Sequence, residues 1–225
     1  MRFQDAAPDA RAVVYAGIQA EPLVARAAAL LADATPAQRV LARAVMNGIS
    51  SEPSAWLTMF PTLFGSGAGG EVPERQRSEA ILATSLAVAE RGEQVRSQVR
   101  GAIVESLTAT LVARRRAADG AVRRERRILF DGVRAEIHPY DVTVETPGAA
   151  EAIDCKWGAR GINADVLHQL DDARSNAVEE GVSLATTLVV FDAERSCRVR
   201  LDRETAPHAE TRLVSLETLD ELARG

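Results

Sequence analysis

The chain contains almost no lysine: of its 27 basic residues, Lys156 is the single lysine and all the others are arginine. Aromatic residues are also scarce, at 4% of the 225 residues, so alanine, leucine and valine must fill most of the core. An apolar content of 46% nevertheless supports a real core. The length fits one large domain or two small ones.

Cysteines are few and long apolar runs are missing. Cys155 and Cys197 fit no zinc-ligand spacing and suggest no disulfide framework. No apolar run reaches the roughly 18 residues needed to span a bilayer, and the stretch from Met1 to Asp5 lacks the apolar core of a signal peptide. We therefore expect a reduced, cytoplasmic protein with no membrane partner.

Basic charge is concentrated in one short region. The net charge of −5 argues against a general nucleic-acid coat. Between residues 114 and 127, however, seven arginines stand against only Asp119 and Glu125. Such a patch is a candidate for contacts with phosphates of a nucleic-acid backbone, and the alternative is a solvated helix end followed by a strand edge. The candidate residues are Arg114, Arg115, Arg116, Arg123, Arg124, Arg126 and Arg127.

The first part of the chain has the pattern of helices. Asp9 is a candidate N-cap, and Thr35-Pro36 combines an N-cap threonine with a proline at the first helical position. A long helical pattern then runs from about residue 73 to residue 116. These signals predict a helical N-terminal region over residues 1–95, with a second domain over residues 96–225.

The pattern changes to strands after Gly120. The predicted elements are strands at 128–130, 140–145 and 150–157, a helix from 163 or 165 to about 180, a strand at 184–191, another at 198–201 and a closing helix at 213–223. Because the strand at 184–191 follows a helical crossover, we expect it to join the sheet in parallel. The predicted fold class is α/β, with helices packed on a mixed central sheet.

Two carboxylates converge in the predicted hairpin. If Pro147 and Gly148 form a two-residue loop, Asp141 lies directly opposite Asp154, with Cβ atoms roughly 5 Å apart. Lys156 follows Asp154 by two residues and therefore points to the same face of the strand. The sequence thus predicts two acids and one ammonium around a single point.

This arrangement suggests a divalent cation. Two neighbouring carboxylates repel each other unless a cation joins them, and Mg²⁺ or Mn²⁺ accepts oxygen ligands. The carbonyl oxygen of Cys155 is a further candidate ligand. Lys156 is a candidate to orient the attacking water and to offset charge in the transition state. The alternative is that Asp154 and Lys156 form an exposed ion pair of little energetic value.

In these residues and their order, the chain resembles the PD-(D/E)XK, or restriction-endonuclease-like, nuclease superfamily. Asp141, Asp154 and Lys156 stand in the places of its two metal-binding acids and its lysine. Glu105 stands in the place of a glutamate that many members carry on the preceding helix. Gln169 stands in the place of a glutamine on the helix after the third strand, although Ala173 replaces the tyrosine that often follows it.

The resemblance implies a core of helix, three strands, helix and strand, and a Mg²⁺- or Mn²⁺-dependent endonuclease that cuts DNA in a restriction or defence role. It implies a homodimer as well, since one such site cuts one strand. The alternatives are a structure-specific repair nuclease, or an inactive nuclease fold that serves as a binding or scaffold module. Residues 1–95 carry no resemblance and are a candidate surface for a partner protein.

Overall fold

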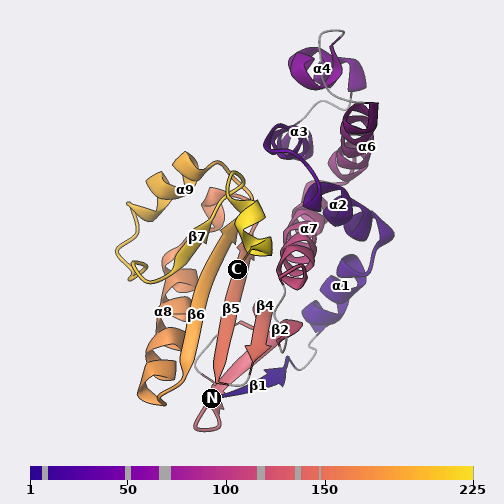
Figure 1. Ribbon diagram of the computed structural model, residues 1–225. Helices are drawn as coiled ribbons and strands as arrows, with labels where there is room; N and C mark the ends of the chain where they lie inside the picture. Colours follow the sequence, from indigo (N-terminus) through magenta and orange to yellow (C-terminus); the bar gives the residue numbers. More distant parts are fainter. Residues whose placement is uncertain are drawn as a thin grey trace. The chain divides into compact units, whose positions relative to one another are not determined.

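The computed structural model of the protein describes residues 1–6, 10–48, 52–65, 72–115, 120–134, 138–146 and 148–224. It forms two compact units: one comprises Ala10–Leu107, and the other combines Met1–Asp9 with Thr108–Gly225. The predicted boundary after residue 95 falls inside a continuous helix, α7 (Glu93–Ala113), and the two units meet on this helix between Leu107 and Thr108. Figure 1 shows the elements of both units.

Helices make up the first unit, as the sequence predicts. They are α1 (Ala10–Gln19), α2 (Pro22–Ala32), α3 (Pro36–Asn47), α4 (Pro53–Met59), α5 (Pro61–Phe64), α6 (Val72–Ala89) and the first part of α7. Helices α2 and α3 pack against α6. Apolar side chains at helical spacing, such as Leu31, Leu41 and Ile81, are buried between them. The proposed cap Asp9 and residue Arg116 lie outside the described residues.

The start of α3 confirms the predicted cap. The Thr35 hydroxyl accepts a hydrogen bond from the Gln38 backbone N–H at 3.3 Å, and the Gln38 side-chain oxygen accepts one from the Thr35 N–H at 2.9 Å. The Gln38 side-chain amide also donates to the Ser78 hydroxyl on α6 at 2.9 Å. This capping box therefore links the start of α3 to its packing against α6.

We expect Thr35→Ala to lower the free energy of unfolding of the helical unit by about 1 kcal/mol, because one N-terminal amide of α3 loses its acceptor. Urea denaturation followed by circular dichroism measures the change. Thr35→Ser keeps the acceptor oxygen and serves as the control. Equal stabilities of the alanine and serine variants would contradict a capping role.

A single sheet organises the second unit. Its strands are β1 (Arg2–Asp5), β2 (Ala121–Phe130), β3 (Val133–Arg134), β4 (Tyr140–Thr146), β5 (Ala149–Lys156), β6 (Ser183–Val190) and β7 (Arg212–Val214). The order across the sheet is β1-β2-β4-β5-β6-β7, and the short β3 pairs with β2. The prediction of helix for the first residues is wrong at Arg2–Asp5, because this segment pairs antiparallel with β2. Because β1 and β2 lie far apart in the sequence, the residues around Arg2–Asp5 do not indicate this pairing.

The sheet is mixed, as predicted. Strands β1, β2, β4 and β5 pair antiparallel, whereas β5, β6 and β7 pair in parallel. Helix α8 (Ala164–Glu179) connects β5 to β6, which confirms the predicted crossover and the parallel orientation of β6. The second unit therefore has a mixed α/β architecture.

Helix α8 packs against β6, and the two elements lie side by side in Figure 1. Asn163 caps the helix by accepting a hydrogen bond from the Val166 N–H at 3.0 Å, and Gly181 ends it with a φ of 68°. Apolar residues of the helix and the sheet form one core cluster, which includes Ala150, Ala152, Leu167, Leu170, Leu184, Leu188 and Val190.

Two C-terminal predictions are wrong. The predicted strand at 198–201 belongs to helix α9 (Glu194–Leu201), where Glu194 and Arg198 form an ion pair one turn apart. The predicted helix at 213–223 is instead strand β7 followed by a short 3-10 helix, η2 (Leu219–Ala223). The open edge of β6 pairs with β7 and overrides the weak local preference of this segment. No helix in the described ranges has the length and apolar character to cross a bilayer.

Candidate functional site

The register of the β4–β5 hairpin agrees with the prediction. Thr146 pairs with Ala149 and Val142 with Ile153, and Asp141 and Asp154 come directly after this last pair. Of the predicted two-residue loop, Pro147 lies outside the described residues, and Gly148 has a φ of 83°, a left-handed value that glycine adopts without strain. Hairpin register alone therefore brings the two predicted acids to neighbouring positions on adjacent strands.

The Asp141 carboxylate lies between the two strands. Its Oδ2 accepts a hydrogen bond from the backbone N–H of Cys155 at 2.6 Å. Backbone amides that point toward a neighbouring strand lie in the plane of the sheet, so this oxygen occupies the place of a main-chain acceptor where β4 and β5 separate. The hydrogen bond fixes Asp141 against the strand that carries Asp154 and Lys156.

Asp154 and Lys156 form an ion pair at the C-terminal end of β5. Oδ2 of Asp154 contacts Nζ of Lys156, and the side chains are 9% and 25% exposed. Apart from this ion pair, the Asp154 oxygen has no hydrogen-bond partner among the described residues. The ion pair of the predicted alternative is therefore present, and its two side chains are largely buried.

The charged state of Lys156 is strongly favoured. Burial alone would lower the pKa of the ammonium, but the neighbouring carboxylates of Asp154 and Asp141 outweigh burial and raise the pKa above its ordinary value. The electrostatic influence of both acids on one ammonium indicates that the predicted trio belongs to one site. Lys156 is therefore a cation at neutral pH.

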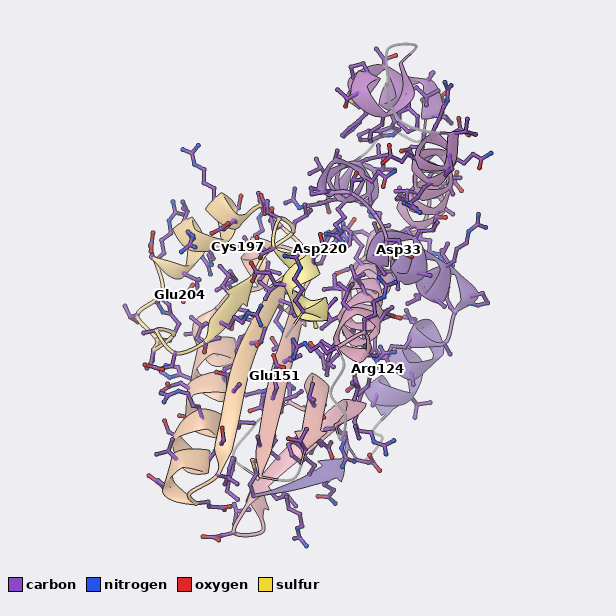
Figure 2. All side chains as sticks on the ribbon, viewed as in Figure 1. Asp33, Arg124, Glu151, Cys197, Glu204 and Asp220 are labelled. Atoms are coloured by element: carbon purple, nitrogen blue, oxygen red, sulfur yellow. The ribbon has the colours of Figure 1, made fainter. Side chains whose placement is uncertain are left out.

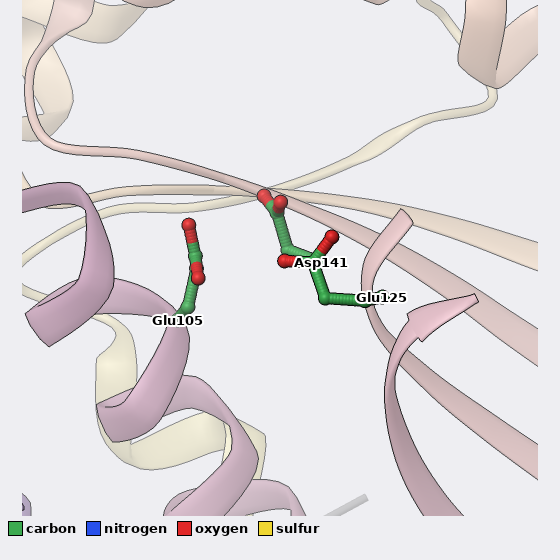
Figure 3. A group of neighbouring side chains, drawn as sticks. All are labelled: Glu105, Glu125 and Asp141. Carbon is green, nitrogen blue, oxygen red and sulfur yellow. The ribbon is translucent and has the colours of Figure 1, made fainter. Parts of the chain in front are cut away.

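Glu125 on β2 is a neighbouring acid that the sequence reasoning missed. Arg124 pairs with Val142 and Arg126 with Tyr140, so Glu125 stands opposite Asp141 in the β2–β4 ladder. Carboxylate oxygens of Glu125 and Asp141 lie within 4.8 Å of each other, and Figure 3 shows the two side chains on their neighbouring strands. In the sequence, Glu125 stands among four arginines, and only the register between β2 and β4 places it beside Asp141.

The backbone of Glu125 is unusual. Its φ is 53°, a left-handed conformation that costs a non-glycine residue about 1–3 kcal/mol. The conformation interrupts the regular alternation of β2 at the position that faces Asp141. A strained acidic residue beside a second carboxylate is typical of a functional position.

We expect Glu125→Gly to raise the free energy of unfolding by about 1 kcal/mol in metal-free buffer, because glycine adopts the left-handed conformation without strain. Glu125→Gln removes the charge but keeps the strain, and it separates the two effects. Thermal denaturation of both variants measures the difference. A glycine variant no more stable than the glutamine variant would contradict stored backbone strain.

Glu105 lies on α7 and is described with the helical unit. Its Oε1 accepts a hydrogen bond from the Tyr15 hydroxyl at 2.5 Å, and its Oε2 accepts one from the Gln19 side-chain amide at 2.7 Å. The side chain is buried. Both oxygens therefore have a role in packing α1 on α7. The prediction that Glu105 binds a metal stays a prediction.

Gln169 supports the strand that carries Asp141. Its side-chain amide donates to the His138 carbonyl at 3.1 Å, and its side-chain oxygen accepts from the His138 N–H at 3.3 Å. The Tyr140 hydroxyl donates to the Gln169 backbone carbonyl at 3.1 Å. Gln169 therefore fixes the chain that leads into β4, the strand that carries Asp141.

The Cys155 thiol does not take part in the carboxylate group. Its Sγ donates to the Thr108 hydroxyl at 3.4 Å, and the cysteine is buried. Because side chains alternate along a strand, this thiol points away from the face that carries Asp154 and Lys156. The proposed metal-binding role of the Cys155 carbonyl oxygen stays a prediction.

Some of the candidate phosphate-binding arginines are already paired within the protein. Arg115 donates to Glu151 on β5, which Figure 2 labels, and to the Leu222 carbonyl at 2.5 Å. Arg126 donates to Glu145 at 2.8 Å and to Asp5. Burial lowers the pKa of Arg126, but these acids outweigh burial and raise it. Arg115 and Arg126 therefore stabilise the sheet unit, whereas Arg114 and Arg123 are exposed.

Comparisons with known proteins give little information on function. No family model and no curated protein matches the sequence. Among solved structures, the chain is similar to the crystal structure of protein VC1899 from Vibrio cholerae, with a TM-score of 0.45 and 16% sequence identity. The similarity covers 90% of this chain and 55% of the other, so the chain spans about half the length of that protein.

Proposed function

We propose that the protein is a Mg²⁺- or Mn²⁺-dependent endonuclease that hydrolyses DNA phosphodiester bonds, built on a restriction-endonuclease-like core. The order of elements supports this proposal: helix α7, the antiparallel strands β2, β4 and β5, helix α8 and the parallel strand β6. In that superfamily the two acids and the lysine sit on the second and third of these strands, which correspond to β4 and β5.

The observation that carries the proposal is the grouping of Asp141, Asp154 and Lys156 at the point where β4 and β5 separate. Asp141 is fixed by the Cys155 amide at 2.6 Å, and Asp154 is paired with a lysine that stays protonated. A structural ion pair alone needs one acid and one base. Here two more carboxylates, those of Asp141 and Glu125, lie close together, and neighbouring carboxylates are the oxygen ligands that a divalent cation takes.

The donor set fits a hard divalent cation. Mg²⁺ binds oxygen ligands at 2.0–2.1 Å in an octahedron, so two oxygens on one ion lie about 3 to 4 Å apart. Oxygens of Glu125 and Asp141 lie within 4.8 Å of each other, which small side-chain adjustments convert into a shared ligand pair. Asp154 would offer its second carboxylate oxygen, while Oδ2 stays paired with Lys156. Carboxylates without thiol or imidazole favour Mg²⁺ and Mn²⁺ over zinc.

When bound, such an ion polarises the phosphate and lowers the pKa of a water molecule. The side chains of the protein do the remaining work. Asp141 and Asp154 hold oxygen ligands in fixed positions, since a backbone amide and an ammonium bind them. The Lys156 ammonium offsets negative charge that develops on the phosphate oxygens during attack, because it remains protonated in this environment.

We propose Glu105, on α7, as an auxiliary acid, because it stands in the place of the glutamate that many members of the superfamily carry on the helix before the three strands. The exposed Arg114 and Arg123 are proposed to contact the DNA backbone.

Incubation of the purified protein with supercoiled plasmid tests the proposed function. We expect nicked and linear DNA in the presence of Mg²⁺ or Mn²⁺ and no cleavage with EDTA. Asp154→Ala is the inactive reference. Persistent lack of cleavage by the wild-type protein on plasmid, branched, nicked and single-stranded substrates would contradict a nuclease and favour the scaffold alternative.

The substrate panel also separates the two enzymatic alternatives. Cleavage of plain duplex DNA favours a restriction or defence role, whereas preference for branched or nicked DNA favours a repair nuclease. Sedimentation velocity with and without DNA tests the expected homodimer, which double-strand cleavage by single-site subunits requires.

A further inference from the structure

A tight turn after β5 closes over the site lysine. The turn is the 3-10 helix η1 (Ala159–Gly161), in which the Gly161 N–H donates to the Gly158 carbonyl at 2.8 Å. A Cβ atom placed on Gly161 would lie 2.9 Å from Cδ of Lys156 and 3.0 Å from its Cβ and Cγ. The turn therefore packs directly on the aliphatic stem of Lys156, and any side chain at position 161 would collide with it.

The turn is fixed at both ends by polar contacts. At its start, the Ala159 N–H donates to Oδ2 of Asp192 at 3.0 Å, and Oδ1 of the same carboxylate accepts from the Ala193 N–H at 2.7 Å. Asp192 is only 6% exposed. At its end, the Arg200 guanidinium donates to the Ile162 carbonyl at 2.9 Å. The turn is therefore anchored to α9 and to the chain that follows β6.

The ends of β5 and β6 are joined as well. The Phe191 N–H donates to the Lys156 carbonyl at 2.8 Å, and the rings of Trp157 and Phe191 stack with centroids 5.0 Å apart. The backbone of Lys156 is thus fixed by β6, and its stem is confined by Gly161. Under these restraints few rotamers remain for the side chain, and one of them puts Nζ against Asp154.

We infer that Gly161 is a positioning residue for the site lysine: the missing side chain lets η1 close on the Lys156 stem and hold its ammonium against Asp154, with Asp192 fixing the turn. The inference rests on the proposed function only for its effect on cleavage. Its structural part concerns the position of Lys156 and is measured separately.

Two glycines of the same turn provide a matched pair of variants. Neither has a left-handed φ, so alanine is compatible with the backbone at both positions. A Cβ on Gly158 would meet its nearest atom, Oδ2 of Asp192, at 3.5 Å, which is an ordinary contact. Gly161→Ala therefore displaces the lysine stem, whereas Gly158→Ala leaves it in place.

Because the chain has a single lysine, protein labelled with ¹³C-lysine gives one set of lysine side-chain NMR signals. We expect nuclear Overhauser contacts from the Lys156 methylenes to the Gly161 α-protons in the wild type and in Gly158→Ala. In Gly161→Ala we expect shifted Cγ and Cδ signals. Identical lysine signals in all three proteins would overturn the inference, whether or not the protein cuts DNA.

A second variant loosens the turn without adding bulk. Asp192→Asn leaves one acceptor oxygen for the two backbone N–H groups of Ala159 and Ala193, and we expect the Lys156 methylene signals to become averaged, as in a mobile side chain. This variant keeps the test decisive if Gly161→Ala does not fold. Unchanged lysine signals in Asp192→Asn would contradict the anchoring role of Asp192.

The cleavage assay measures the functional consequence. We expect Gly161→Ala to lower kcat about 100-fold with little change in KM, since a displacement of about 1 Å at a reacting group has an effect of this size. Gly158→Ala should cut DNA like the wild type. A shifted lysine signal combined with unchanged kcat would refute the functional part of the inference. A wild-type protein without cleavage would refute the proposed function alone.

Discussion

Asp141→Asn is expected to lower metal-dependent DNA cleavage at least about 1000-fold. Such a loss corresponds to about 4 kcal/mol of transition-state stabilisation, within the several kcal/mol that a bound metal supplies. The asparagine side chain still accepts a hydrogen bond from the Cys155 amide, so the hairpin stays intact. Only the charge that binds the cation is lost.

The measurement is the initial rate of plasmid nicking, together with Mg²⁺ or Mn²⁺ binding by calorimetry. Asp172→Asn, which removes an exposed acid on α8, is the control and should leave both quantities unchanged. An Asp141→Asn variant that binds the cation and cuts DNA at the wild-type rate would exclude this carboxylate from the site.

Lys156→Met is expected to have the second large effect, on both stability and cleavage. The change leaves the Asp154 carboxylate buried without its counter-charge. Removing one partner of a fully buried pair costs 3–5 kcal/mol, and because the lysine is 25% exposed we expect a loss of about 2 kcal/mol. We expect cleavage to fall about 100-fold or more, since the transition state loses a fixed positive charge.

The control for charge is Arg160→Met, which removes an exposed cation from the same turn. Lys156→Arg keeps the charge, but the bulkier guanidinium group does not fit next to Gly161. We therefore expect this variant to recover only part of the nicking rate. Urea denaturation and nicking rates measure the two effects. Full activity of Lys156→Met would exclude an electrostatic role in the reaction.

The pH dependence follows from the direction of the pKa shift. The folded protein raises the pKa of Lys156, so it holds the proton more tightly than the unfolded chain. The resulting stabilisation is complete below the unfolded lysine pKa of about 10.4 and is lost only as pH rises through the higher folded value. We expect no lysine titration in the cleavage rate between about pH 6 and 9. A rate increase with the pKa of a lysine in that range would indicate a general base instead.

The site shows how far local sequence information reaches. The positions of Asp141, Asp154 and Lys156 follow from a two-residue loop and the alternation of strands, so the hairpin register could be predicted by counting residues. The residue next to Asp141 on the other neighbouring strand, β2, could not be predicted in this way. Glu125 comes opposite Asp141 because of the β2–β4 register, which a long connection between these strands leaves open.

The N-terminal strand and the turn at Gly161 illustrate the same limit. Arg2–Asp5 has no strand signal of its own and becomes a strand because β2 offers an open edge. Gly161 looks like an ordinary turn glycine in the sequence, and its contact with Lys156 arises from the path of the chain after β5. Asp192 reaches the same turn from the end of β6.

Properties that depend on neighbours along the chain were therefore decided by the sequence itself: the helices of the first unit, the Thr35 cap, the hairpin register and the parallel crossover to β6. Their causes are hydrogen bonds, dihedral preferences and side-chain periodicity within a few residues. The tertiary structure alone decided which distant groups share one environment, namely Glu125 beside Asp141, Gln169 beneath His138, and Gly161 and Asp192 around Lys156. These contacts depend on how the strands and turns pack together, and the spacing of residues along the sequence does not determine that packing.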